Sequence, residues 1–299
     1  MSTFRPFRAI RPRAIFAKQV ASPPYDVLNS DEAKIEASGN PYSFLHVIKP
    51  EIDLDSDIDP YSEPVYEQGQ KKLDEFKKQN ILQKDDYPHF YVYRLTMDSR
   101  TQTGIVGCCH FEEYFQGRIK KHELTREAKE KDRIRHIEAQ NANAEPVFFS
   151  YHGKEKINSL VDEIMQDSKE YDFIADDGVR HELWVVKNYS LIKAIQNEFL
   201  EVSIFYVADG HHRTAAAAKV GKDKKDLNPN HLGNEEYNFF MAVLFPDDQL
   251  KIFDYNRVVS QLNGFSEKDF LRQLEDSFEI SRLTSAKRPR SKGSFSMYL

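Results

Sequence analysis

A strand, a tight turn and a helix follow one another without a spacer in the stretch FYVADGHHRTAAAAK, residues 205–219. The apolar residues 202–208 are rich in β-formers and stop abruptly at Asp209 and Gly210. The four alanines that begin at Ala215 strongly favour a helix. Gly210 supplies the backbone freedom that a sharp strand-to-helix turn needs. The stretch therefore predicts one strand-turn-helix unit, around which the rest of the fold has to be built.

The turn of this unit places chemically active side chains at the start of the helix. A helix N-terminus exposes unpaired N–H groups and the positive end of the dipole, which suit an anion. Arg213 can fork onto a phosphate, and imidazoles can bind it or move protons. As an alternative, Asp209 is an N-cap, Gly210 a turn residue, and the histidines part of a solvated surface. We expect a phosphate- or nucleotide-binding turn made of Asp209, Gly210, His211, His212 and Arg213.

The amino-acid composition limits the classes of protein to which this chain can belong. The chain has 299 residues, 40% of them apolar and 30% charged, with a net charge of −6. This balance opposes nucleic-acid binding, and no apolar run reaches the length of a membrane span. The first 25 residues lack the apolar core of a signal peptide. Cys108 and Cys109 match no zinc or redox motif, so we expect reduced, structural thiols in a cytoplasmic protein.

Turn signals at residues 98–103, 116–117 and 176–178 favour antiparallel hairpins. The predicted fold class is therefore α+β, with mixed, largely antiparallel sheets and packed helices rather than a doubly wound parallel sheet. Strands are expected at 4–12 (an edge strand or extended arm), 43–48, 89–97, 103–115, 118–123, 146–151, 171–175, 181–186, 202–208, 239–245, 250–259 and 278–283. Helices are expected at 30–39, 61–80, 125–140, 155–167, 191–199, after Gly210 and at 266–277, and residues 222–236 are expected to form a loop that could act as a lid.

No linker divides the chain clearly, so residues 1–299 are interpreted as one large α+β unit. Its possible sub-regions are residues 1–150 and residues 151–299. The last seven residues, 293–299, have the alternation of a strand that has just begun. We therefore expect the chain to be a C-terminally truncated piece of a longer protein.

A second candidate site lies at His122 and Glu123, between the end of a predicted strand and a predicted helix over 125–140. Strand ends in mixed α/β folds are places where sites gather. Glu123 is a candidate general base for a hydroxyl nucleophile, because burial beside apolar groups would raise its pKa. The alternative is that both side chains pair with surface lysines.

The helix over 125–140 mixes charges of both signs at three- and four-residue spacing, which is typical of a solvated, ion-paired face. As an alternative, Lys129, Arg133 and His136 line a cleft. Neither histidine pair has the spacing of a zinc-binding helix, and the acidic residues 53–59 fail the calcium-loop pattern. The sequence therefore leaves any metal undetermined.

Several motifs resemble, in order and from end to end, a bacterial and archaeal family catalogued as domain of unknown function 1015. The residues that carry the resemblance are 4–12, 22–27, 119–125, 144–149, 208–213 and 255–259. Members of that family continue past the end of this chain, which supports the expected truncation.

The turn at Asp209 also resembles the phosphate-binding turn of the ParB/sulfiredoxin-like superfamily, which includes free-serine kinases with an Asp-Gly-His-x-Arg turn. His212 fills the variable position here. The resemblance implies that Gly210, His211 and Arg213 hold nucleotide phosphates and that an upstream carboxylate acts as the base. Sulfiredoxin's reactive cysteine is absent from the turn, which disfavours sulfinic acid reduction.

These observations lead to the expectation of a nucleotide-dependent phosphotransferase acting on a small hydroxyl metabolite such as serine. ATP or ADP, with Mg²⁺ as a further candidate, would bind at the turn, and Glu123, His122 or Asp26 would serve catalysis. The alternatives are a phosphatase or other hydrolase of a phosphorylated metabolite, and a non-catalytic module that binds a nucleotide or phosphate. The expected partners are a small-molecule substrate and a nucleotide, with no membrane; the oligomeric state stays open.

Overall fold

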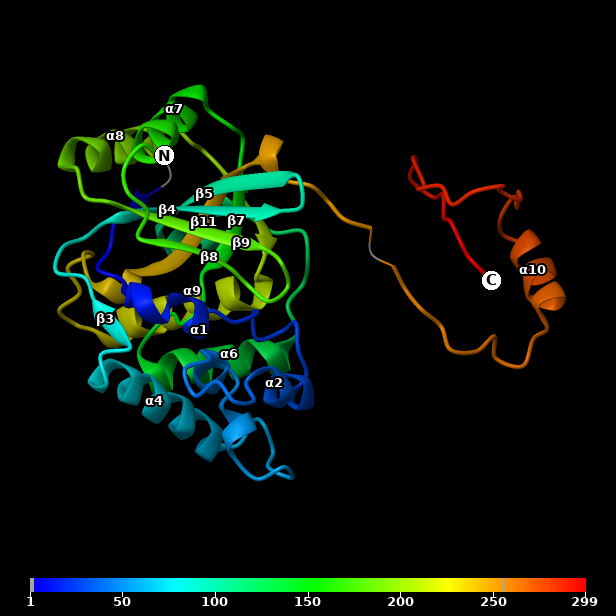
Figure 1. Cartoon of the computed structure of the whole chain (residues 1–299), viewed down its shortest axis with the longest axis horizontal. Coiled ribbons are helices and arrows are strands. Elements are labelled where there is room, and N and C mark those ends of the chain that lie inside the picture. The colour runs from blue at the N-terminus through cyan, green and yellow to red at the C-terminus, as the bar shows by residue number, and fades with distance from the viewer. Residues whose placement is uncertain (1–2, 255) are drawn as a thin grey trace. The chain divides into compact units, whose positions relative to one another are not determined.

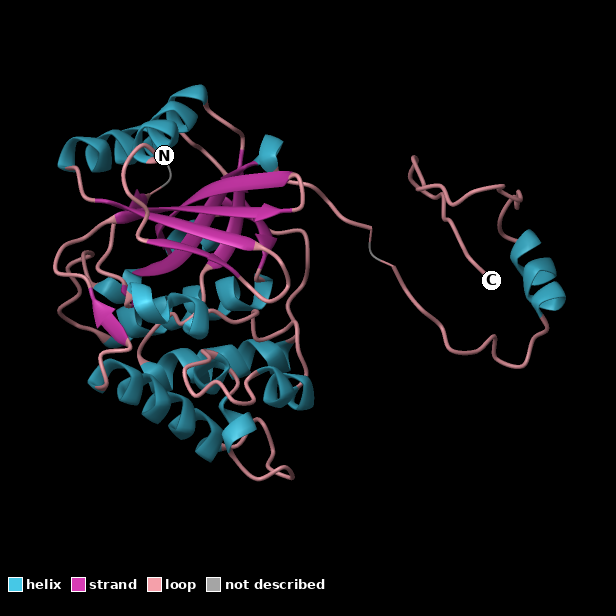
Figure 2. Cartoon of the chain, viewed as in Figure 1, coloured by secondary structure: helices cyan, strands magenta, loops and turns pink. Residues whose placement is uncertain are grey.

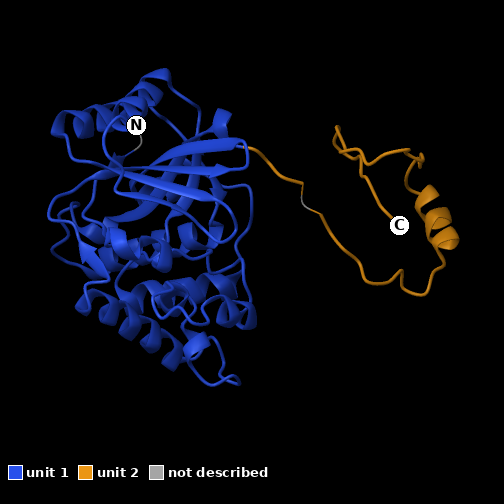
Figure 3. Cartoon of the chain, in the orientation of Figure 1, with its two compact units in different colours: residues 1–250 blue, residues 251–299 orange. Residues whose placement is uncertain are grey.

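A computed structural model describes residues 3–254 and 256–299 of the chain. The chain forms two compact units, residues 1–250 and residues 251–299 (Figure 3). The first unit contains the sheet and the candidate site. In the second, the described residues contain one helix, α10 (Glu267–Glu275), which begins after the N-cap Ser266 as predicted.

A mixed sheet forms the centre of the first unit (Figures 1 and 2). The strand order is β6-β10-β7-β11-β5-β4-β9-β8, and β1 also pairs with β5. The pairs β6–β10 and β7–β11 are parallel, and all the others are antiparallel. The predicted α+β class with a mixed, largely antiparallel sheet is therefore confirmed. The strands are β1 (Phe4–Arg5), β4 (Phe90–Met97), β5 (Arg100–His110), β6 (Ile119–Lys120), β7 (Val147–Tyr151), β8 (Tyr171–Ile174), β9 (Arg180–Val186), β10 (Phe205–Asp209) and β11 (Phe239–Pro246).

Helices cover both faces of this sheet. Helices α7 and α8 pack together on one face, whereas α9, α6 and α4 follow one another in layers on the other (Figure 1). A separate two-stranded ribbon pairs β2 (Ile10–Pro12) with β3 (Leu82–Lys84). The α-helices of the first unit are α1 (Ala17–Val20), α2 (Ser30–Glu36), α3 (Leu45–Ile48), α4 (Glu63–Lys78), α5 (Glu112–Phe115), α6 (Glu127–Gln140), α7 (Glu155–Ile164), α8 (Tyr189–Leu200) and α9 (His211–Leu227).

The alanine run explains why α9 can lie between the sheet and α6. Ala215, Ala216 and Ala218 are completely buried, and Ala217 is nearly so. Ala215, Ala217 and Ala218 belong to the same core cluster as Phe149 of β7. Small side chains allow other elements to pack closely against both sides of a helix. The alanine run therefore favours the helix and also allows it to lie between the sheet and α6.

Several predicted elements differ from the structure for local reasons. Within the strand predicted at residues 43–48, residues 45–48 form α3 instead, because a short, largely apolar run has no period that separates strand from helix. The helix α6 starts at Glu127, since the Thr125 hydroxyl donates to Glu130 (2.8 Å) and does not cap the helix. Helix α9 continues to Leu227, through part of the predicted loop.

The predicted strands of the second unit are also wrong in the part that the structure describes. Residues 250–254, 256–259 and 278–283 contain no strand, and neither do residues 293–299. Tyr255 lies outside the described residues. Within this unit, the described residues contain no other strand with which these segments could pair. Strand propensity without a pairing partner does not produce a strand.

Candidate functional site

Gly210 shapes the turn between β10 and α9. Its φ of +84° lies in the left-handed region, which glycine adopts without the steric cost that other residues pay. A Cβ atom at this position would also lie 3.2 Å from Cζ and Nε of Arg213, because that side chain folds back over the turn. Two separate constraints, backbone conformation and close packing, therefore require glycine here.

The first turn of α9 presents backbone donors that no side chain caps. The N-cap residue is Gly210 itself, and the first helical bond runs from the N–H of Thr214 to its carbonyl oxygen (2.8 Å). Across the described residues, no acceptor meets the N–H groups of His211, His212 or Arg213. Open donors at the positive end of a 17-residue helix make an arrangement suited to an anion.

The parallel pairing of β6 with β10 brings the second predicted motif to the same edge of the sheet. Both strands run in one direction, so the residues after Lys120 and Asp209 leave the sheet side by side. The imidazole rings of His122 and His211 lie 4.4 Å apart, edge to face. Oε2 of Glu123 lies 3.6 Å from Nδ1 of His211. The structure thus places the two predicted motifs in one cluster.

His211 is the buried member of this cluster. Burial lowers the pKa of its imidazole, His122 lowers it further, and Glu123 acts in the opposite direction. The ring is therefore neutral near pH 7. In the described part of the chain, its Nε2 atom is buried without a hydrogen-bond partner. An unpaired buried nitrogen is costly, so it marks a place where a ligand or water would bind.

His212 connects α9 to the start of α6. Its Nε2 atom accepts a hydrogen bond of 3.0 Å from the backbone N–H of Arg126, so the ring carries its proton on Nδ1 when neutral. Burial lowers the pKa of His212, and the charge of Lys129 lowers it further. The two predicted histidines therefore have different surroundings: His211 faces Glu123, and His212 holds two elements together.

Arg213 is already engaged within the protein. Its Nη2 donates to the carboxylate of Asp209 (2.7 Å) and its Nη1 to the carbonyl oxygen of Pro146 (2.8 Å). Its Nε atom is buried and has no partner among the described residues. The guanidinium thus connects the start of β7 to the turn. Because Nη1 and Nη2 are bonded within the protein, Nε is the nitrogen of this group that lacks a partner among the described residues.

The predicted carboxylates lie near the turn but are not buried. The Glu123 side chain is 61% exposed, so it lacks the burial beside apolar groups that the sequence led us to expect. Asp26 is exposed as well, and its charge acts on His212 and on Tyr25. Both carboxylates are exposed and so remain accessible from solvent.

Helix α6 has the predicted solvated, ion-paired face only in part: Lys131 and Glu127 form an exposed ion pair (2.6 Å), whereas other charged residues of the helix are buried. It lies between α4 and α9, so polar residues on both of its sides are buried. Asp132 accepts hydrogen bonds from Nε and Nη2 of Arg133 (2.9 and 2.6 Å) and from the Tyr66 hydroxyl (3.0 Å). Burial alone would raise the pKa of Glu130, but hydrogen bonds from Lys219 and Thr125 lower it.

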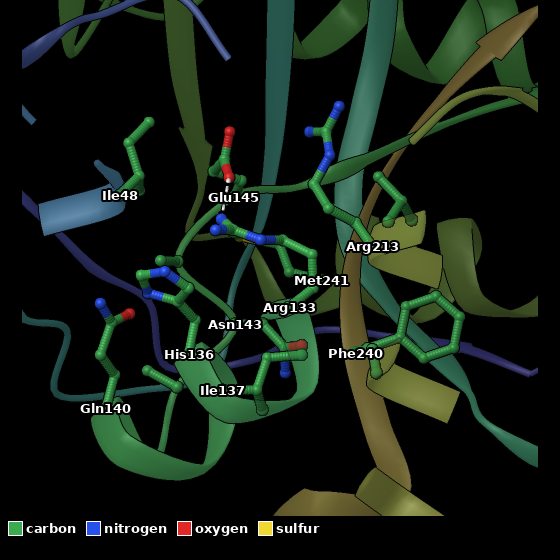
Figure 4. Close-up of a pocket in the computed structure, with 14 residues that line it drawn as sticks. Ile48, Arg133, His136, Ile137, Gln140, Asn143, Glu145, Arg213, Phe240 and Met241 are labelled. Atoms are coloured by element: carbon green, nitrogen blue, oxygen red, sulfur yellow. Dashed lines mark ion pairs between the residues drawn. The ribbon is translucent and has the colours of Figure 1, made fainter. Parts of the chain in front are cut away.

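Arg133 and His136, both on α6, line a small cavity (Figure 4). They are two of the three residues that the alternative interpretation placed along a cleft; Lys129, the third, is not among the lining residues. The sequence interpretation missed the carboxylate on the opposite wall, Glu145. Its side chain is 11% exposed; burial raises its pKa, and Arg213 and Arg133 oppose that change. The signal in the sequence that could have indicated this site is a single charged residue between Ala144 and the buried start of β7.

A search of the described residues finds no group of three or more histidine, cysteine, aspartate or glutamate side chains placed to hold a metal ion. Within the same residues, none of the helices is long and apolar enough to cross a membrane.

Comparison with known proteins gives one match. The family model described as "Protein of unknown function (DUF1015)" matches residues 4–299. No curated protein and no solved structure matches the chain.

Proposed function

Since the chain belongs to the DUF1015 family, whose description states no activity, we propose from the site itself that the protein is a nucleotide-dependent phosphotransferase acting on a small hydroxyl metabolite such as serine. The observation that carries the proposal is the open first turn of α9 beside the His122–Glu123–His211 cluster. Phosphoryl transfer needs little beyond charge stabilisation and positioning, which such an arrangement supplies.

In this proposal the nucleotide phosphates bind the N–H groups of residues 211–213. Neutral His211 donates a hydrogen bond from Nε2 when its proton resides there, which supplies the partner that this buried atom lacks. The Asp209–Arg213 pair keeps the turn in shape, and it also cancels the negative charge that Asp209 would otherwise direct at the phosphates. Mg²⁺ bound with the nucleotide would supply further neutralisation of charge.

Glu123 serves as the base in the transfer step. The substrate hydroxyl attacks the terminal phosphorus, and a new O–P bond forms while the bond to the leaving diphosphate breaks. The hydroxyl proton passes to the Glu123 carboxylate, whose neighbour His211 lies 3.6 Å away. Because Glu123 is exposed, its contribution depends on a bound substrate that excludes water from it.

The exposure of Glu123 also favours a second candidate, a non-catalytic module that binds a nucleotide or phosphate. The Glu123 carboxylate is open to solvent, whereas catalytic acids and bases are commonly buried in clefts. Such a module would use the same helix N-terminus and would show binding without turnover.

Calorimetric titration with ATP and ADP, followed by an assay for phosphoserine formation, tests the proposal. Wild-type protein is expected to bind nucleotide at millimolar concentration or below and to form the phosphorylated product. Glu123→Gln should retain nucleotide binding and lose turnover by about 100-fold or more, the usual effect of removing a general base. Glu138→Gln, which changes an exposed glutamate on α6, is the matched control.

The outcomes separate the candidates. Absence of nucleotide binding at millimolar concentration overturns the phosphotransferase proposal. Binding without turnover of any phosphoryl donor supports the non-catalytic module. Equal activities of Glu123→Gln and Glu138→Gln would remove Glu123 from the role of base.

A further inference from the structure

One side chain in the first turn of α9 holds the segment that carries Glu123. Nε2 of His212 accepts a hydrogen bond of 3.0 Å from the backbone N–H of Arg126, the N-cap residue of α6. Glu123 precedes Arg126 in the segment 121–126, which leads from β6 into α6. The bond therefore joins the proposed anion-binding turn directly to the segment of the candidate base.

The segment 121–126 has few other anchors. Within the described residues, none of its other backbone N–H groups has an acceptor. Leu124 is 92% exposed, and the 3.6 Å between Glu123 and Nδ1 of His211 is too long for a hydrogen bond. The position of Glu123 therefore depends on how the ends of the segment are held. The side-chain anchors at these ends are Lys121 on the Tyr114 hydroxyl (3.4 Å) and Thr125 on Glu130 (2.8 Å).

His212 accepts the bond from Arg126 only while its imidazole is neutral, because an imidazolium carries a proton on both nitrogens. The charges around the ring decide which form is present. Burial lowers the pKa of His212, and the charge of Lys129 lowers it further. The groups that act in the opposite direction are the carboxylates of Glu123, Asp26 and Glu130. The neutral form therefore dominates near pH 7, and the bond is formed.

Lys129 matters most when the turn is occupied. An anion at the first turn of α9 favours the imidazolium form of His212, because an opposite charge nearby raises the pKa of a histidine. The ammonium of Lys129 acts against this change. It therefore helps to keep the bond to Arg126 in place while phosphates are bound.

We propose that His212 is the positioning residue that keeps Glu123 beside the first turn of α9, and that it does so only as the neutral imidazole, the form that Lys129 favours. The inference rests on the proposed function only for the role of Glu123 as the base. The link between His212 and the segment 121–126 stands without it.

Hydrogen exchange of the Arg126 amide, measured by NMR on the full chain without nucleotide, tests this link. In the wild-type protein, the protection of this amide should fall at least about tenfold as the pH drops through the pKa of His212, after correction for the intrinsic exchange rate. His212→Gln keeps an acceptor that does not titrate, so protection should persist in acid. His212→Ala should lose protection at every pH, whereas the control His152→Gln should behave like the wild-type protein.

Lys129→Gln tests the second part of the inference in a protein that keeps His212. This variant should raise the pKa of His212 in the NMR titration and shift the loss of Arg126 protection to higher pH. Lys131→Gln is the matched control, because Lys131 lies on the same helix but pairs with Glu127 (2.6 Å). It should change neither quantity.

Turnover and binding should separate in His212→Ala. Phosphoserine formation is expected to fall at least about tenfold, since the base is no longer held in place. The affinity for pyrophosphate, measured by calorimetry, should change less than about threefold, because the N–H groups of α9 remain. His212→Gln should recover most of the turnover, which the loss of a phosphate-binding imidazole would not allow.

Arg126 protection that stays constant while His212 titrates in the wild-type protein overturns the inference, as does equal protection in His212→Ala. If His212→Ala fails to fold, the wild-type and His212→Gln series decide. An unchanged pKa of His212 in Lys129→Gln removes Lys129 from its role. A confirmed link in a protein that binds no nucleotide would retain this inference and remove the phosphotransferase proposal. Turnover without the link would do the reverse, so the two failures are distinguishable.

Discussion

Nη2 of Arg213 donates a hydrogen bond of 2.7 Å to the carboxylate of Asp209, which lies on the other side of the turn. The same guanidinium bonds the carbonyl oxygen of Pro146 and covers Gly210. One side chain therefore holds the end of β10, the start of β7 and the first turn of α9 in a fixed arrangement.

The two partners of this ion pair should differ in their effect on stability. Arg213→Gln leaves the Pro146 carbonyl unpaired and removes a buried side chain, so it should lower the free energy of unfolding by about 2–3 kcal/mol. Asp209→Asn removes an exposed charge and should cost less than about 1 kcal/mol. Urea denaturation measures both, and equal losses would contradict the asymmetric role of the pair.

Substitution of Gly210 tests the close approach of Arg213. Gly178 also has a positive φ, +82°, but a Cβ there would meet nothing within 4 Å. Gly178→Ala should therefore cost only the left-handed backbone conformation, about 1 kcal/mol. Gly210→Ala should cost about 2 kcal/mol, since it also displaces the guanidinium from its partners. Chemical denaturation of the two variants checks this, and identical losses would mean that Arg213 moves aside freely.

His136 should make the protein less stable in acid. Burial, and then the charge of Arg133, lower the pKa of His136 to about 2. The unfolded chain takes up a proton at this residue near its ordinary pKa of about 6.5, whereas the folded chain does not. Stability should therefore fall as the pH drops below about 6.5, by up to about 1.4 kcal/mol per pH unit.

Unfolding free energies measured between pH 4 and 8 test the role of His136. His136→Gln should reduce the slope of the unfolding free energy with pH by the amount that corresponds to one proton. His152→Gln provides the control, because the His152 side chain is 80% exposed. An unchanged slope in His136→Gln would show that the imidazole titrates in the folded protein.

The two cysteines should resist thiol reagents in the native protein. Burial raises the pKa of Cys108 to about 12, and burial also raises the pKa of Cys109. Since only the thiolate reacts, modification at pH 8 should be at least about 100-fold slower than in the unfolded chain. A colorimetric thiol assay with and without guanidinium chloride measures this, and rapid reaction of native protein would contradict the buried positions.

The strand-turn-helix at residues 205–219 was predictable because its signals are local. The apolar run, Asp209-Gly210 and the alanines each act within a few residues, and tertiary packing agrees with all of them. The antiparallel hairpin of β8 and β9 was predictable for the same reason, since Gly178 occupies a turn position with positive φ.

Features that depend on distant partners were not predictable. Residues 45–48 form a helix that is packed among apolar neighbours, and Glu130, Asp132, Arg133 and His136 of α6 are buried because α4 and α9 pack against this helix. Glu145 becomes part of a site only when β7 starts beside Arg213 and Arg133. Neither the strand order nor the layering of helices is encoded within a short window, so periodicity alone could not reveal these contacts.

The parallel pairing of β6 with β10 also dictates when the candidate site can form. Parallel neighbours cannot be joined by a tight turn, and the contact between Arg126 and His212 spans 86 residues. Bringing the ends of so long a segment together loses chain entropy before the stabilising contact forms. The hairpins β4–β5 and β8–β9, whose strands are close in sequence, should therefore assemble first. During synthesis, the ribosome must therefore release α9 before the chain acquires any binding site at this edge. A nascent chain that stops before residue 211 would lack both the first turn of α9 and β11, the strand that joins β7 to β5.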